Sequence, residues 1–270
     1  MAGNKPQLGA ETQYPERYDP QLLVSIPRAP AREKLNIATA MYGVDVWTAY
    51  EISWLNPGGK PSVAIAEFVV PCDSAAIVES KSFKLYLNSL NQECFDNREQ
   101  VLQTLAKDLA VGFGCPVQVL LYSLDEYASK GLQPFRGDCL DDLPVVCDSY
   151  DAEPSLLAVL DEPPVSETLY SHLLKSNCPV TGQPDWASVQ ISYTGKPIVK
   201  EGLLRYLVSF RQHQDFHENC VETLFAAILE RCRPQDLSVY ARYTRRGGLD
   251  INPYRSTTQQ LPPFCRISRQ

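Results

Sequence analysis

One pattern of residues occurs twice in this chain, and a duplicated pattern restricts the fold to two similar modules. Residues 77–89 read IVESKSFKLYLNS and residues 197–209 read PIVKEGLLRYLVS, so that a shared Tyr-Leu pair recurs 120 positions later. Upstream, residues 51–54 (EISW) resemble residues 190–193 (QISY), and a Gly-Lys-Pro turn follows each of them. Each half therefore reads as strand, turn, strand, helix and then further strands. The alternative is a coincidental likeness between short strand and helix segments.

An amphipathic helix is predicted in each half, downstream of the repeated segment. The first lies in residues 95–109 (FDNREQVLQTLAKDL) and the second in residues 216–232 (FHENCVETLFAAILERC). Both have apolar residues at the spacing that places side chains on one helix face. These residues are Val101, Leu102, Leu105 and Leu109 in the first helix and Val221, Leu224, Phe225 and Ile228 in the second. Residues 237–243 (LSVYARY) then alternate as a strand does.

The two predicted modules meet in a stretch rich in Asp, Glu and Pro at residues 131–168, where apolar patches suggest that part of the stretch packs as strand. We expect an N-terminal module at residues 1–155, which carries the Glu-Ser-Lys-Ser segment. The C-terminal module is expected at residues 156–270, which contain Cys178.

Composition limits the classes of partner. The net charge is −7, and the sequence pI is about 5.1, whereas proteins that grip polynucleotides usually carry a basic stripe. We therefore expect no direct nucleic-acid partner. No apolar stretch is long enough to cross a bilayer, and the polar first residues do not resemble a signal peptide. The nine scattered cysteines include no Cys-x-x-Cys pair, which favours reduced thiols and a cytoplasmic location.

The run SNCPVTGQPDW at residues 176–186 is the strongest candidate for chemistry. Cys178 lies among Pro179, Gly182 and Pro184, which exclude regular structure and hold the thiol on a loop. Asp185 follows seven residues later at the start of a predicted strand. A thiol and a carboxylate brought together in this way form a candidate nucleophile and proton partner. The alternative is an ordinary buried cysteine.

The two halves differ at the positions that carry chemistry. By the repeat, the predicted counterparts are Thr39 for Cys178, Asp96-Asn97 for His217-Glu218, and Val199 for Glu79. Each half has candidate site residues at positions where the other half has none, so we expect one composite site that uses residues of both halves.

The histidines allow two interpretations. His213 and His217 are four residues apart, with Glu218 next, as in a helical zinc-binding face. Asp215 and Glu218 also match a capping box, which would leave His213 outside the helix, and no third ligand is evident. We therefore expect no metal site, and His217 instead fits a proton carrier.

Glycines and charged residues give weaker signals. Gly112-Phe113-Gly114 lacks the third glycine and the surrounding strands of a dinucleotide fingerprint, so it predicts no such site. The arginines at positions 242, 245 and 246, beside Gly247-Gly248, suit a 2′-phosphate as well as they suit a solvated strand edge. Residues 79–82 (ESKS) close the first strand segment, either as a solvated turn or with Glu79 as a ligand carboxylate.

Four separated motifs together resemble one enzyme family. They are VESKSFKLYLNS (78–89), SNCPVTGQPDWA (176–187), FHENC (216–220) and YTRRGGLDINP (243–253). This set is similar to the NADPH-dependent nitrile reductases of queuosine biosynthesis, the 7-cyano-7-deazaguanine reductases, in their long two-module form. The resemblance extends over residues 15–270 and shows no departure at a key position.

The resemblance implies an α+β fold of two tandem tunnelling-fold modules, with antiparallel sheets backed by helices. It also implies reduction of the nitrile of 7-cyano-7-deazaguanine to the aminomethyl compound, in the pathway of a tRNA modification, by a cytoplasmic homodimer. Cys178 would form a covalent thioimide, Asp185 would donate a proton, and His217 would assist. The implied substrate-binding residues are Val78, Glu79, Ser80, His217 and Glu218, and the implied NADPH-binding residues are Ser80, Lys81, Arg246 and Gly247.

Two other functions remain open at this point. A zinc-dependent hydrolase of the same fold, similar to GTP cyclohydrolase, would use Cys178 and His217 as metal ligands. A non-enzymatic module that binds a deazapurine would not need Cys178.

Overall fold

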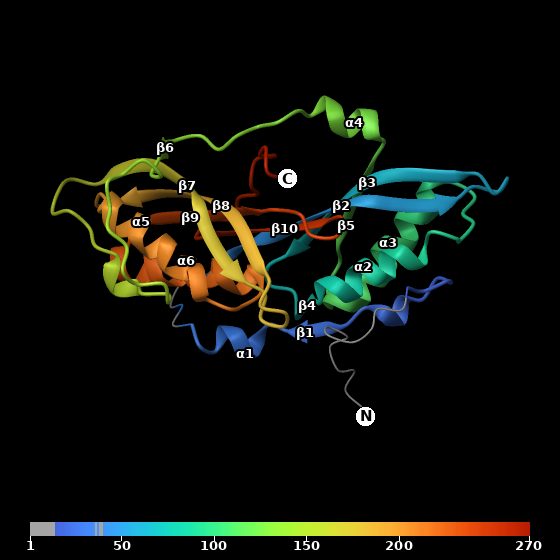
Figure 1. Cartoon of the computed structure of the whole chain (residues 1–270), viewed down its shortest axis with the longest axis horizontal. Coiled ribbons are helices and arrows are strands. Elements are labelled where there is room, and N and C mark those ends of the chain that lie inside the picture. Colours follow the sequence, from blue (N-terminus) through green and yellow to red (C-terminus); the bar gives the residue numbers. More distant parts are fainter. Residues whose placement is uncertain (1–13, 36, 38–39) are drawn as a thin grey trace. The chain divides into compact units, whose positions relative to one another are not determined.

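The computed structural model describes residues 14–35, 37 and 40–270 and divides the chain into two compact units (Figure 1). Unit 1 holds the described residues up to Pro30, together with Asp45–Gly131 and Arg245–Asp250. Unit 2 holds the described residues of Ala31–Val44, together with Leu132–Thr244 and Ile251–Gln270. The main division thus follows Gly131, whereas the sequence placed it at residue 155.

Unit 1 is built on strands in the order β5-β3-β2, with helices α2 and α3 on one side of them (Figure 1). Strand β5 pairs antiparallel with β3, and a separate antiparallel pair joins β1 to β4. Aromatic rings fill the core, where Phe83 packs edge-on against Trp47 and Phe68 at centroid distances of 5.0 and 5.1 Å. The elements are η1 (Pro20–Leu22), β1 (Ser25–Pro27), β2 (Tyr42–Leu55), β3 (Pro61–Pro71), β4 (Ala76–Val78), α2 (Ser80–Ser89), α3 (Arg98–Phe113), β5 (Gln118–Tyr122) and α4 (Leu124–Ser129).

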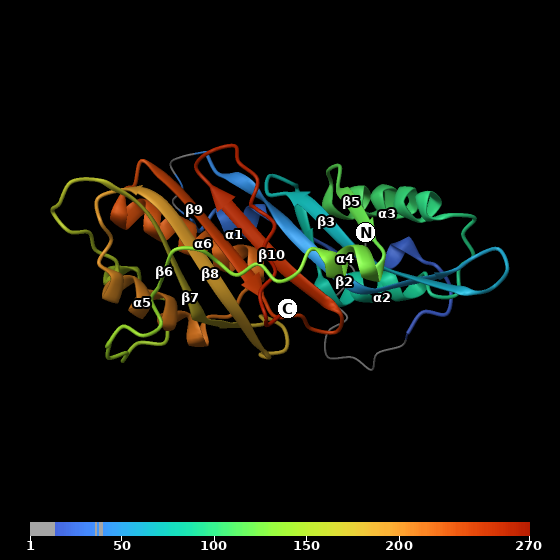
Figure 2. The ribbon, with the colours of Figure 1, turned by 90° about the horizontal axis from the view of Figure 1, so that it is seen from above.

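Unit 2 has strands in the order β10-β9-β8-β7-β6, of which only the short β6 runs parallel to its neighbour (Figure 2). Helices α5 and α6 cover one face of these strands, and apolar side chains from both layers form the core (Figure 1). The elements are α1 (Ala29–Arg32, of which Ala31 and Arg32 belong to this unit), β6 (Asp138–Cys139), η2 (Pro154–Leu156), β7 (Val165–Asn177), β8 (Pro184–Gly195), α5 (Lys200–Ser209), η3 (Phe210–Gln212), α6 (His217–Cys232), β9 (Asp236–Tyr243) and β10 (Leu249–Ser256, of which the residues from Ile251 onward belong to this unit).

The predicted repeat is present as a repeat of elements. Helices α2 and α5 begin at Ser80 and Lys200, 120 positions apart, and the long helices α3 and α6 follow them. The predicted apolar faces of helices α3 and α6 are confirmed. Each apolar residue predicted to lie on these faces is buried, except Leu102, which is partly buried. Helices α2 and α5 were not predicted, because the repeated segments at residues 77–89 and 197–209 were interpreted as part of the strands and turns that precede the long helices.

The upstream alignment of the two halves is wrong. Residues 51–54 lie in β2, the first strand of a hairpin, whereas residues 190–193 lie in β8, the second strand of the other hairpin. The loop that holds Cys178 joins β7 to β8, so its counterpart is the turn at residues 56–60 between β2 and β3. Thr39, the counterpart predicted from the sequence, lies outside the described residues. The turn at residues 56–60 also has no thiol, so the candidate nucleophile Cys178 has no thiol counterpart in the other copy.

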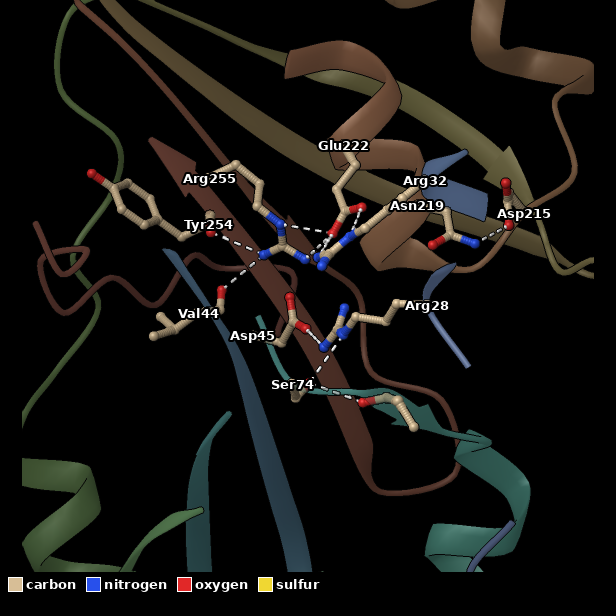
Figure 3. A network of polar contacts seen from close by, with 11 residues as sticks. Arg28, Arg32, Val44, Asp45, Ser74, Asp215, Asn219, Glu222, Tyr254 and Arg255 are labelled. Atoms are coloured by element: carbon tan, nitrogen blue, oxygen red, sulfur yellow. Dashed lines mark hydrogen bonds and ion pairs between the residues drawn. The ribbon is translucent and has the colours of Figure 1, made fainter. Parts of the chain in front are cut away.

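Each unit contains a buried ion-pair network (Figure 3). In unit 1, the guanidinium group of Arg28 binds the carboxylate of Asp45 and donates from Nε to the Ser74 hydroxyl at 3.0 Å. In unit 2, the Glu222 carboxylate accepts from Arg255 at 2.8 Å and from Arg32 at 2.7 Å. Because the carboxylates of both networks have lost their water, removal of one partner leaves an uncompensated charge.

All nine cysteines lie in the described part of the chain, where they are free thiols. Over those same residues, no helix combines the length and apolar character that a membrane span requires.

Candidate functional site

The β7–β8 hairpin of unit 2 brings the Cys178 loop and Asp185 to the same end of two strands. Ser176 pairs with Asp185, and Asn177 pairs with Pro184, so Cys178 is the first residue beyond the ladder. The loop is closed by hydrogen bonds from the Cys178 N–H to the Gln183 carbonyl at 2.9 Å and from the Gly182 N–H to the Cys178 carbonyl at 3.0 Å. The thiol of a half-buried residue is thus presented on a loop with fixed ends, as the sequence predicts.

Asp185 and His217 form a pair, of which Asp185 is buried and His217 is partly buried. The Asp185 residue is 3% exposed, and its Oδ2 lies 3.4 Å from Nε2 of His217, the first residue of helix α6. A carboxylate beside an imidazole can hold and transfer a proton. The hairpin and the helix together therefore place a thiol, a carboxyl group and an imidazole in one unit.

The start of helix α6 differs from the predicted capping box. Phe216 occupies the N-cap position, and its side chain makes no cap hydrogen bond. Asp215 instead accepts from the Phe216 N–H at 2.8 Å and from the Asn219 side-chain amide at 2.7 Å. Helix α3 begins at Arg98 and α6 at His217, so the structural counterparts of His217-Glu218 are Arg98-Glu99 and not Asp96-Asn97.

A stacked tyrosine holds the His217 imidazole. The rings of His217 and Tyr243 lie 3.7 Å apart at an interplanar angle of 2°, so they are parallel. The Nδ1 atom of His217 is buried and has no hydrogen-bond partner among the described residues, and Glu218 beside it is also buried. Buried polar atoms normally have partners, and exceptions often mark functional sites. Sequence reasoning missed Tyr243, although the residue begins the fourth motif.

His213 does not join His217 in a metal site. It lies before helix α6, and its carbonyl accepts from the Asn177 N–H at 2.8 Å. Burial lowers the pKa of its imidazole, which therefore favours the neutral form. Among the residues that the structure describes, no group of three His, Cys, Asp or Glu side chains is arranged to hold a metal ion.

In unit 1, Glu79 is a buried helix cap and not a solvated turn residue. It follows β4 and is 1% exposed. Its Oε1 accepts from the Lys81 N–H at 3.0 Å, and its Oε2 accepts from the Ser82 N–H at 2.7 Å. The equivalent cap of α5 is Val199, which has no such bonds, so the predicted difference between the copies corresponds to a difference in capping.

The other expected residues of unit 1 surround the same helix start. Val78 is buried at the end of β4, Ser80 is exposed and Lys81 is partly buried. Glu79 belongs to unit 1 and Cys178 to unit 2, so a composite site stays a prediction.

The three arginines near the glycine pair have different environments. Arg242 is buried in β9, where its Nε donates to Gln270 at 2.7 Å and its Nη1 donates to the Tyr240 hydroxyl at 2.8 Å. It is therefore neither a solvated edge residue nor open to a phosphate. The guanidinium of Arg245 lies 4.2 Å from the centre of the Tyr50 ring, while Arg246 is partly buried in the turn that follows.

A small pocket in unit 1 lies beside the glycine pair. Gly247 and Gly248 have φ angles of 57° and 80°, which favour glycine. A Cβ at Gly247 would lie 2.6 Å from Nζ of Lys84, and one at Gly248 would lie 2.4 Å from the Glu51 carboxyl carbon. Lys84 lines this pocket. It lies three residues after Lys81 on helix α2, a spacing that places both side chains on the same helix face, so the sequence contained a signal for Lys84.

Comparison with known proteins places the chain in a class of reductases. Residues 14–121 match the family described as "Nitrile reductase, 7-cyano-7-deazaguanine-reductase N-term", and residues 184–261 match the family "QueF-like protein". Among relatives named NADPH-dependent 7-cyano-7-deazaguanine reductase, the protein of Teredinibacter turnerae is 54% identical, with 97% of each chain covered. That of Dechloromonas aromatica is also 54% identical, over 95% of this chain and 92% of the relative. That of Burkholderia multivorans is 54% identical over 97% of each chain.

These matches define a nitrile reductase of the α+β class. The chain belongs to the NADPH-dependent 7-cyano-7-deazaguanine reductase family, and its two units are tandem tunnelling-fold modules, as the sequence motifs predict.

Proposed function

We propose that this chain reduces the nitrile of 7-cyano-7-deazaguanine to a primary amine, with NADPH as the reductant. The observation that carries the proposal is the position of Cys178 on a closed loop, at the hairpin end that also carries the buried Asp185 in contact with His217 of helix α6. Relatives of the same length and more than half identical in sequence carry the corresponding name.

Cys178 is the proposed nucleophile and Asp185 the proton donor. The thiolate forms a C–S bond with the nitrile carbon, and a proton goes to the nitrile nitrogen, which gives a thioimide. His217 stabilises the carboxyl group of Asp185 through the contact of 3.4 Å and can return a proton to it. Two NADPH molecules, bound one after the other, would each supply one of the two hydrides that reduction of a nitrile to an amine requires.

The proposed substrate-binding residues are Val78, Glu79, Ser80, His217 and Glu218. The buried carboxylates accept hydrogen bonds from the N–H and amino groups of the heterocycle. The Oε atoms of Glu79 each accept one helix N–H, and a carboxylate oxygen has a second lone pair for a ligand. A site that makes such bonds rejects analogues that lack the donors.

The proposed NADPH-binding residues are Ser80, Lys81, Arg246 and Gly247 in unit 1. The glycine pair fits this role because it leaves open the space that a Cβ would fill beside Lys84. Lys84 therefore joins the set as a further cation, and Arg246 suits the 2′-phosphate that distinguishes NADPH from NADH.

We further propose that the protein acts as a cytoplasmic homodimer with a small deazapurine substrate and without a nucleic-acid or membrane partner. The free thiols support the cytoplasmic location, and the acidic net charge supports the absence of a nucleic-acid partner.

Mass spectrometry of the protein mixed with 7-cyano-7-deazaguanine, without NADPH, tests the proposal. We expect one adduct of the nitrile's mass on the wild-type protein and on Cys94→Ala, which removes an exposed thiol in unit 1. Cys178→Ala should remain unmodified and inactive. An unmodified wild-type protein, or an active Cys178→Ala protein, would refute the covalent mechanism.

The hydrolase alternative makes a different prediction. It requires stoichiometric zinc in the purified protein, which metal analysis detects directly. The names of the relatives favour the reductase over this hydrolase.

A further inference from the structure

Side chains hold the backbone of Tyr243 at the end of strand β9. The register between β9 and β10 runs from Ser238–Ser256 to Tyr240–Tyr254, and Tyr243 lies three residues beyond it. Its N–H donates to Oδ1 of Asn252 at 3.1 Å, and its carbonyl accepts from Nε2 of Gln270 at 3.1 Å. Two side-chain amides therefore fix the backbone at the residue that stacks on His217.

The carboxamide of Gln270 is fully engaged in this arrangement. Gln270 is 6% exposed, and its Oε1 accepts from Nε of Arg242 at 2.7 Å and from the Ile267 N–H at 3.3 Å. Its Nε2 donates to the Tyr243 carbonyl and to Oδ1 of Asn252 at 2.8 Å. A carboxamide has two acceptor sites and two donor hydrogens, so every one of them is used. A buried network that is satisfied in this way is rigid and specifies one arrangement.

Because the backbone of Tyr243 is fixed, its ring fixes the orientation of the His217 imidazole that stacks on it. The ring is buried, and on the other side β9 pairs with β8, where Tyr243 is opposite Ala187, two residues from Asp185. Burial raises the pKa of the Tyr243 hydroxyl and of the neighbouring Cys220 thiol, so both stay protonated. Tyr243 therefore acts on His217 through the face of its ring and not as an acid or a base.

We propose that Tyr243 is a positioning residue for His217 and that the Gln270 carboxamide, with Asn252, anchors Tyr243 for this task. The inference rests on the proposed role of His217 and Asp185. A position 53 residues after His217 thus controls whether Nε2 of that histidine faces Asp185. A displacement of about 1 Å in such a group costs about a hundred-fold in rate.

Gln270→Glu tests the anchor with little change in side-chain shape. The carboxylate keeps the interaction with Arg242 but places an acceptor against the Tyr243 carbonyl and Asn252 Oδ1. The matched control is Gln235→Glu, an exposed position at the other end of β9 that adds the same charge. We expect adduct formation and kcat to fall roughly 10- to 100-fold in Gln270→Glu, with the KM for NADPH unchanged and Gln235→Glu like wild type.

Tyr243→Leu and Tyr243→Phe test the stacked ring. Tyr243→Leu removes the ring, whereas Tyr243→Phe keeps the ring and loses only the hydroxyl. Tyr243→Phe should therefore retain most of the rate that Tyr243→Leu loses. The three histidines of the chain can be followed by NMR without turnover. The ring protons of His217 should lose their upfield shift in Tyr243→Leu and change in Gln270→Glu, but not in Gln235→Glu.

The outcomes separate this inference from the proposed function. If wild type and Gln235→Glu both form no adduct, the proposed function fails. If wild type reacts and Gln270→Glu and Tyr243→Leu react equally fast, the positioning role is overturned. Unchanged His217 resonances in both variants overturn it as well, even if the variants lose stability.

Discussion

Glu79 allows ligand binding and helix capping to be measured separately. Its carboxylate accepts two backbone N–H groups at 2.7 and 3.0 Å in a nearly water-free position. Glu79→Ala leaves both donors without an acceptor and removes a negative charge from a helix N-terminus. Loss of a cap costs about 1–2 kcal/mol. At about 2–4 °C per kcal/mol, Tm should fall by about 2–8 °C.

Glu79→Ser keeps the cap and removes the proposed ligand contact. Serine is a favoured N-cap residue, and its hydroxyl accepts the same kind of N–H bond, so most of the lost Tm should return. Its side chain is too short to offer a carboxylate to the heterocycle. Both variants should therefore bind the nitrile more weakly, by about 1–3 kcal/mol or roughly 5- to 150-fold in Kd.

Calorimetry in a Cys178→Ala background measures this binding without the covalent step, and circular dichroism gives the Tm. Glu79→Gln should be intermediate, because its amide keeps one acceptor and adds donors. If Glu79→Ser binds the nitrile as tightly as the parent while Glu79→Ala still loses stability, Glu79 is a cap and not a substrate ligand.

Other residues give further expectations. Cys178→Ala should abolish turnover and leave Tm unchanged, since the thiol lies on a loop outside the core; a Tm loss in unfolding curves would contradict this. Arg246→Ala should reduce the preference for NADPH over NADH by roughly 10- to 100-fold, because one charge-assisted contact is worth about 1.5–3 kcal/mol; an unchanged ratio of kcat/KM values would reject the assignment. Arg255→Ala should cost about 1.5–3 kcal/mol in denaturant unfolding, because the buried Glu222 carboxylate loses its charge-assisted hydrogen bonds from Arg255 and keeps those from Arg32; a cost below about 0.5 kcal/mol would show that the pair is dispensable. The pKa of His213 is lowered in the folded state, so the unfolded state binds more protons and stability should fall as pH drops from about 6.5; His213→Asn should flatten that slope.

The sequence predicted the long helices well and the short helices poorly, for a physical reason. Helices α3 and α6 carry an apolar stripe over four turns, which is a strong periodic signal. Helices α2 and α5 begin after Glu79 and Val199, which are not favoured N-cap residues, so their starts carry no local signal.

The site was predictable where it depends on local sequence. The Pro- and Gly-rich run places Cys178 on a loop, and a hairpin with that loop at its tip brings Asp185 to it. The contact of Asp185 with His217 and the stacking of Tyr243 depend on how helix α6 and strand β9 pack, which spacing does not encode. The burial of Arg242 likewise depends on Gln270, far along the chain.

The division of the chain into units has a consequence for synthesis on the ribosome. Most of unit 1 lies before residue 132, but the unit also includes Arg245–Asp250. In that segment, the Gly248 carbonyl accepts from the Tyr50 N–H at 2.9 Å, and the Asp250 carboxylate accepts from the Tyr50 hydroxyl at 2.7 Å. These residues leave the ribosome more than a hundred residues after the rest of the unit. Unit 1 is therefore complete only after nearly the whole of unit 2 has been translated. A fragment of residues 1–155 would lack Arg246 and Gly247, so splitting the gene at that point would separate these two proposed NADPH-binding residues from helix α2, which carries the other two.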